Sequence, residues 1–297
     1  MDGYTADETL AIEIGSEFVT KDAPYMVKSD FMKSLGPKKD VVRKIVIGEG
    51  IEGIGRSAFR DFKALADIVI PKGVTNIGES AFMGCKGLTG ITIPEGVTNI
   101  GESAFEGCLG LTSVIIPTSV VEIGDSAFDD CIGLTSVVIP DGVTAIGSMT
   151  FNDCSGLTSV VIPESVMEIG TYAFAGCASL TSVNIPANVK EIKEGTFEGC
   201  LCLSSIVIPK GVDKIGQCAF KDCKGVTSIV IPDSVTEIYG GAFLACTGLA
   251  SVTIPPSVKI IGHWAFHDCA ALTSVRIPMG VLLEAEAFPF ECDLTSY

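Results

Sequence analysis

The chain has 297 residues, of which 47% are hydrophobic and 19% charged, which is enough apolar material for a folded core and excludes a disordered chain. Its 36 Asp and Glu outnumber its 20 Lys and Arg, and the net charge of -16 argues against binding to nucleic acid or anionic membranes. No apolar run approaches the ~20 residues of a membrane-spanning helix, and the N-terminus lacks the basic residues of a signal peptide. We expect no membrane insertion, and a cytoplasmic location unless the chain is a fragment of a surface protein.

Residues 1–41 precede the periodic part of the sequence. They combine acidic residues with alternating apolar residues such as Leu10, Ile12 and Ile14. The ends of repeat proteins need polar caps that cover the apolar core and the free strand edge. We therefore predict an N-terminal cap or flanking segment over 1–41. A remnant of a separate upstream domain is the alternative.

A repeat of 23 residues organises residues 42–297. Ile precedes each periodic proline, and Phe and Cys recur with the same step, from Phe59 to Phe266 and from Cys85 to Cys292. A fixed period of this length predicts a solenoid, because a propeller blade needs about 40–50 residues and four strands. We count about eleven coils, the last one degraded, with Phe288 one residue early, as expected of a C-terminal cap. The periodic prolines are Pro71, Pro94, Pro117, Pro140, Pro163, Pro186, Pro209, Pro232, Pro255 and Pro278.

The spacing within one coil predicts its local structure. Val114 and Ile116 are two apart and share one face of a short strand, which Pro117 ends because it cannot donate to a ladder. Gly124 permits a sharp turn, and the buried residues of 127–131 have the spacing of a short helical turn. That turn ends at a column of Gly or Asp, which tolerate the left-handed conformation. This column contains Gly84, Gly107, Asp130, Asp153, Gly176, Gly199, Asp222 and Asp268.

The repeated pattern Leu-x-x-Val-x-Ile-Pro-x-x-Val-x-x-Ile-Gly-x-x-Ala-Phe-x-x-Cys, as in residues 111–131, resembles the BspA-type (treponemal) leucine-rich repeats over about residues 42–292. The resemblance implies an α/β solenoid shaped as a horseshoe, with a parallel β-sheet on its concave face. It also implies a non-enzymatic role in binding other proteins, at the surface or inside cells. The general leucine-rich pattern has Asn or Cys where this chain has Ser119, Gly142 and Ser165.

The twelve cysteines predict a buried, reduced column. Ten follow the repeat, and adjacent coils would bring them ~4.8 Å apart, but with parallel Cβ vectors that do not suit a disulfide. No CxxC metal motif is present, and many unpaired thiols fit a reducing compartment. Cys202 and Cys218 lie outside the column and are the better candidates for reactive thiols.

Other chemistry has weaker support. His263 and His267 have the i, i+4 spacing that places two imidazoles on one metal, but both occupy variable, exposed positions of the repeat. No nucleotide-binding glycine motif is present. We therefore predict no catalytic residues, no metal and no cofactor.

The outward side of each strand is the predicted site for a protein partner. Its central column is mostly apolar and has serines beside it. β-branched residues favour strands in any case, but an apolar stripe with a polar rim is also typical of a binding surface. A threonine column (Thr89, Thr112, Thr135, Thr158) suggests ice binding more weakly, because it lies at a bend and lacks a second threonine rank. The predicted contact residues on the concave face are Ile115, Val138, Val161, Asn184, Val207, Val230, Ser136, Ser159 and Ser182.

The sequence thus predicts a scaffold that binds proteins through this face. The alternative is a structural or cell-surface adhesive array, in which the repeats act as a spacer and the chain is a fragment of a larger surface protein.

Overall fold

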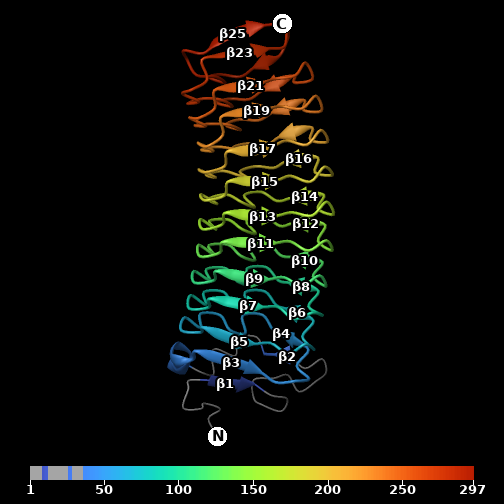
Figure 1. The fold of residues 1–297 in the computed structure, drawn as a ribbon, viewed down its shortest axis with the longest axis vertical. Helices are drawn as coiled ribbons and strands as arrows, with labels where there is room; N and C mark the ends of the chain where they lie inside the picture. Colours follow the sequence, from blue (N-terminus) through green and yellow to red (C-terminus); the bar gives the residue numbers. More distant parts are fainter. Residues whose placement is uncertain (1–8, 13–25, 29–35) are drawn as a thin grey trace.

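The computed structural model describes residues 9–12, 26–28 and 36–297, in which the chain forms a column of stacked coils (Figure 1). Each coil adds one strand to each of two parallel ladders, and the apolar core lies between them. Within these residues the only helix is the short 3-10 helix η1 (Gly36–Val41). The first ladder consists of β1 (Thr9–Ile12), β3 (Lys44–Ile47), β5 (Asp67–Val69), β7 (Gly90–Thr92), β9 (Ser113–Ile115), β11 (Ser136–Val138), β13 (Ser159–Val161), β15 (Ser182–Asn184), β17 (Ser205–Val207), β19 (Ser228–Val230), β21 (Ser251–Thr253), β23 (Ser274–Ile277) and β25 (Asp293–Ser296). The second ladder consists of β2 (Met26–Val27), β4 (Gly53–Ile54), β6 (Asn76–Ile77), β8 (Asn99–Ile100), β10 (Glu122–Ile123), β12 (Ala145–Ile146), β14 (Glu168–Ile169), β16 (Glu191–Ile192), β18 (Lys214–Ile215), β20 (Glu237–Ile238), β22 (Ile260–Ile261) and β24 (Leu282–Leu283).

The 23-residue period sets the register of both ladders. Val138 in β11 lies opposite Val161 in β13, and Ile146 lies opposite Ile169 in the second ladder. Figure 1 shows a nearly straight column rather than a curved one, so the predicted horseshoe with a concave face is not confirmed. We therefore call the outward surface of the first ladder the strand face.

A continuous stack of phenylalanines fills the core. From Phe59 to Phe288, the ring centroids of neighbouring coils are 5.0–5.7 Å apart, and every ring except Phe288 is at most 1% exposed. Phe288 lies one residue early in the sequence and still stacks on Phe266 at 5.0 Å. The last coil is thus shortened without breaking the aromatic column.

The N-terminal strands extend both ladders ahead of the first periodic coil. β1 pairs with β3 and β2 pairs with β4, both in parallel. This is the position expected of the predicted cap. The rest of residues 1–35, including Ile14, lies outside the described residues, and the division of the chain at residue 41 stays a prediction.

The prediction of a short helical turn in each coil is wrong, because the hydrogen bonds of this segment are not those of a helix. In the segment from Ser103 to Cys108, alternate N–H groups donate to the next coil, as from Phe105 to the Ala127 carbonyl oxygen at 2.8 Å. The N–H groups between them donate three residues back within the coil. Left-handed conformations at Ser103 (φ 54°) and Gly107 (φ 67°) produce this alternation, because they turn successive N–H groups in different directions. The segment thus forms a third set of bonds between coils instead of a helix.

Two left-handed columns therefore recur along the chain. The one predicted from Gly and Asp is confirmed, with Asp130 at φ 56° and Gly176 at φ 69°. The second, which includes Ser57, Ser80 and Ser126, was not predicted, because serine carries no strong signal for this conformation.

The glycine that follows most second-ladder strands allows close approach of two coils. A Cβ atom on Gly124 would lie 2.5 Å from the Glu102 nitrogen of the preceding coil, while its φ is not left-handed. The predicted turn glycine is thus present for space rather than for φ. Lys193 and Tyr239 occupy the equivalent position in two coils. The backbones of neighbouring coils can therefore move apart locally to accept a side chain, at a cost in stability.

Substituting this glycine should destabilise the protein. We expect Gly124→Ala to lower the free energy of unfolding by about 1–3 kcal/mol, because the added methyl group forces two backbones apart. Gly90→Ala is the matched control: its Cβ would have 3.4 Å to the nearest atom, and other coils have serine there. Urea denaturation of both variants tests this, and equal stabilities would contradict the close-approach argument.

Candidate functional site: the strand face

The middle of the strand face carries an exposed apolar column. Its Val and Ile side chains alternate with buried neighbours, as in β11, where Val137 is buried and Val138 exposed. The predicted exposure of these strand positions is confirmed. The exposed members are Val69 (44%), Ile115 (63%), Val138 (62%), Val161 (54%), Val207 (74%) and Val230 (68%). We call this set the apolar column.

A row of exposed serines lies beside the column. Ser136 lies opposite Ser159, and Ser159 lies opposite Ser182, so the row continues across four strands from Ser113. Within the described part of the chain, the hydroxyls of Ser136, Ser159 and Ser182 form no hydrogen bond. They remain available to a partner as donors and acceptors.

The threonines at the next bend are already engaged. The Thr112 hydroxyl donates to the Thr89 carbonyl oxygen at 2.9 Å, and Thr158 donates to that of Thr135 at 3.0 Å. These hydroxyls therefore connect consecutive coils. The idea that they form an ice-binding lattice loses its main support, since their donors are directed along the column.

Asn184 interrupts the apolar column and contacts the backbone of the preceding coil. Its Nδ2 donates to the Ile162 carbonyl oxygen at 2.7 Å, and the Ile162 N–H donates to its Oδ1 at 3.4 Å. The amide thus supplies ladder bonds between β13 and β15. Its predicted contact with a partner stays a prediction, with both amide ends occupied in this structure.

A groove opens over β17, β19 and β21. The first ladder is unpaired between β17 and β19, as it also is between β5 and β7 and between β21 and β23. The volume of the groove is about 960 Å³, and its floor includes Ile206, Ile229 and Ile231. Val207 and Val230, the two most exposed members of the apolar column, also line it. The strand face is therefore hollowed where its apolar side chains protrude furthest.

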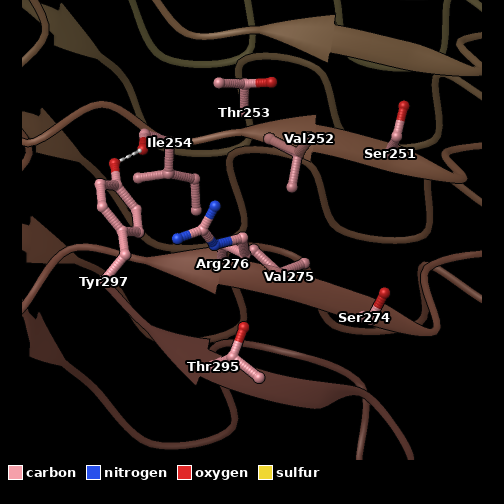
Figure 2. Close-up of a pocket in the computed structure, with 9 residues that line it drawn as sticks. All are labelled: Ser251, Val252, Thr253, Ile254, Ser274, Val275, Arg276, Thr295 and Tyr297. Atoms are coloured by element: carbon pink, nitrogen blue, oxygen red, sulfur yellow. Dashed lines mark hydrogen bonds between the residues drawn. The ribbon is translucent and has the colours of Figure 1, made fainter.

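Tyr297 lines this groove at its C-terminal end and also lines the neighbouring pocket over β21, β23 and β25 that Figure 2 draws. Figure 2 shows its ring next to Arg276, whose guanidinium carbon is 5.0 Å from the ring centroid, a cation–π contact. Its hydroxyl donates to the Ile254 carbonyl oxygen, two coils away from its own strand. The residue lies after the last repeat, so no periodic signal identified it.

The cysteine column is structural. Nine thiols, from Cys85 to Cys269, each donate to the carbonyl oxygen of a phenylalanine 26 residues earlier, at 3.0–3.2 Å. Burial raises the pKa of the Cys108 and Cys200 thiols to about 12, which keeps them protonated. All twelve cysteines are free, as predicted, but Cys292 is only half-buried. Cys202 is exposed. The thiol of half-buried Cys218 has a raised pKa, mainly because of its burial and also because of the negative charge of Glu198, and it is therefore less reactive.

The two histidines make separate contacts. The His263 ring packs against Trp264 with centroids 4.0 Å apart, whereas His267 Nε2 lies 3.5 Å from an Asp268 carboxylate oxygen. In the described ranges, no three His, Cys, Asp or Glu side chains gather as a metal site would require. No helix of the described residues is long and apolar enough to cross a bilayer.

Comparison with known proteins identifies the repeat. Residues 38–157, 75–203 and 190–297 match the model of the BspA type leucine rich repeat region. A leucine-rich repeat protein from Bacteroides ovatus is 25% identical, with a TM-score of 0.52 over 97% of this chain and 92% of that chain. The T. pallidum leucine rich repeat protein is 31% identical, with a TM-score of 0.51 over 58% of this chain and 78% of that chain.

A more distant structure agrees in fold. A leucine-rich repeat protein from Eubacterium ventriosum is 19% identical, with a TM-score of 0.55 over 99% of this chain and 92% of that chain. No curated protein matches the chain. The family model covers almost the whole periodic region, and the chain belongs to the BspA-type leucine-rich repeat family.

Proposed function

We propose that this protein is a non-enzymatic scaffold that binds a protein partner through its strand face. The apolar column carries this proposal: six Val and Ile side chains are exposed at the same position of their coils, three of them in the consecutive strands β9, β11 and β13. Contiguous exposed apolar side chains with a polar rim are typical of interaction surfaces. Solenoids of this family are generally scaffolds rather than enzymes, which agrees with this role.

The second ladder provides an internal comparison. Its outward strand positions are mostly polar or charged, as at Asn99, Glu122, Glu168 and Glu191. A preference of strands for β-branched residues would act on both ladders. Among the described strands, exposed Val and Ile occur in the first ladder alone, and the second ladder has one exposed large apolar residue, Leu282. This difference favours a binding role over strand propensity alone.

A pair of matched double variants tests this proposal. We expect Val138→Glu with Val161→Glu to reduce partner capture at least about tenfold, because two carboxylates would be desolvated in the interface. Val121→Glu with Met167→Glu is the control, since those side chains are 54% and 58% exposed on another side of the coil. Capture from lysate and extracellular matrix, with circular dichroism to confirm folding, compares them. Equal capture by both variants would contradict the strand-face assignment.

The cellular location belongs to this proposal as well. No comparison supports the cytoplasmic location that was expected from the N-terminal sequence and the free thiols, and proteins of this family are often found at the cell surface. We propose that the same face serves in either place. A surface location would also allow the alternative role, an adhesive array in which the repeats act mainly as a spacer.

A further inference from the structure

Charge is unevenly distributed along the column of coils. Residues 87–189, which span the strands from β7 to β15, contain eleven Asp and Glu and no Lys, Arg or His. Among the described residues, Glu168 is the one carboxylate of this stretch that has an ion-pair partner, Lys193 in the next coil. The central coils therefore present a negative field that the chain itself leaves largely unneutralised.

Two of these carboxylates, Asp141 and Glu164, flank the apolar column at Val138 and Val161, and Glu95 has the same position in the coil of Thr92. Glu95, Asp141 and Glu164 each follow a periodic proline, three residues after the outward position of their strand, and all are exposed. Glu164 also accepts a hydrogen bond from the Ala187 N–H at 3.1 Å. The opposite flank is the neutral serine row. At Val138 and Val161 the apolar column is thus bordered by acid on one side only, while Thr118 has this position beside Ile115.

The spacing of the column distinguishes between possible partner conformations. Its members repeat once per coil, about 4.8 Å apart, so Ile115 and Val161 are separated by about 9.6 Å. Along the apolar stripe of an α-helix, the first and third apolar residues are about seven residues and 10.5 Å apart. In an extended strand, the first and third residues on one face are about four residues and 13 Å apart. A helical stripe therefore stays aligned with the column over these coils, and an extended chain does not.

We propose that the strand face of the central coils binds a basic amphipathic helix of a partner protein. Its apolar stripe lies along Ile115, Val138 and Val161, and Lys or Arg on one flank of that stripe face Asp141 and Glu164. This inference rests on the proposed function and specifies the chemistry of the partner. The groove over β17–β21 has mixed charge, with Lys210 and Asp233 at its rim, and does not share this preference.

A peptide probe tests the inference on the full chain. The probe is a synthetic helix of about 18 residues with a Leu stripe and Lys on one flank, and its counterpart has Glu in place of Lys. The variant Asp141→Lys with Glu164→Lys reverses the acidic rim. The control, Glu102→Lys with Glu122→Lys, makes the same change of net charge on the second ladder and its adjoining turn. Fluorescence anisotropy gives each Kd, and circular dichroism reports peptide helicity and protein folding.

We expect the Lys peptide to bind at least about tenfold more tightly than the Glu peptide, and to gain helicity on binding. The variant Asp141→Lys with Glu164→Lys should weaken binding of the Lys peptide at least about tenfold, whereas the control variant should weaken it less than about threefold. Raising NaCl from about 50 to 300 mM should also weaken binding of this peptide. Equal loss in both reversals, equal affinity for both peptides, binding without helicity, or no binding of the Lys peptide would each overturn the inference.

The Val138→Glu and Val161→Glu variant separates the two proposals. If it abolishes partner capture while rim reversal changes nothing, the strand face binds a partner of other chemistry and only the basic helix is wrong. If it leaves both partner capture and Lys-peptide binding unchanged, the strand-face function fails together with the inference built on it.

Discussion

Replacing Phe174 with alanine is expected to lower the free energy of unfolding by about 3–5 kcal/mol, because it opens a cavity in a continuous core. The ring is fully buried and stacks between Phe151 at 5.5 Å and Phe197 at 5.7 Å, with interplanar angles of 9° and 6°. Both aromatic contacts are lost at once. Each coil contacts mainly its neighbours, so the gap also weakens the coupling between the two halves of the column.

Urea denaturation followed by circular dichroism measures this loss, and hydrogen exchange locates it. We expect faster exchange in the coils next to residue 174 and a broader unfolding transition, because the halves unfold less cooperatively. Phe290→Ala is the matched control, since that ring is fully exposed and its removal should cost less than about 0.5 kcal/mol. A Phe174→Ala variant as stable as wild type would contradict the role given to the stack.

Raising the pH above about 8.5 under reducing conditions is expected to destabilise the protein progressively. Burial holds the folded-state pKa of the Cys108 and Cys200 thiols above the unfolded value, at about 12, and it also raises the pKa of the Cys131, Cys154 and Cys177 thiols. The unfolded chain therefore releases protons that the folded chain retains. The stabilisation is complete below the unfolded pKa and decreases by roughly 1 kcal/mol per thiol per pH unit as pH rises towards the folded pKa.

Denaturant midpoints at intervals between pH 7 and about pH 11 test this dependence. The variant Cys154→Ala, which lacks one buried thiol and its bond to the Phe128 carbonyl oxygen, should show a shallower loss of stability. Cys202→Ala is the control, because that side chain is exposed and should leave the slope unchanged. Identical slopes in all three proteins would show that the buried thiols do not govern the alkaline response.

Several features of the candidate site follow from sequence alone. The alternation around Val138 and Val161 predicts their exposure, since same-face residues of a strand are two apart. The sequence could not show that the Asn184 amide forms hydrogen bonds with the preceding coil, because those bonds depend on the rotamer of the side chain. Nor could it place Tyr297, which reaches a carbonyl oxygen 43 residues away and lies outside every repeated column.

The sequence by itself determined the period, the register and the buried columns, because each coil can bury its apolar residues only against an identical neighbour 23 residues away. Only the tertiary structure decided the straight column, the third set of bonds between coils and the groove over β17–β21. These depend on how backbone donors of one coil meet acceptors of the next. Small differences in that geometry, such as the unpaired step between β17 and β19, leave no mark in the repeat pattern.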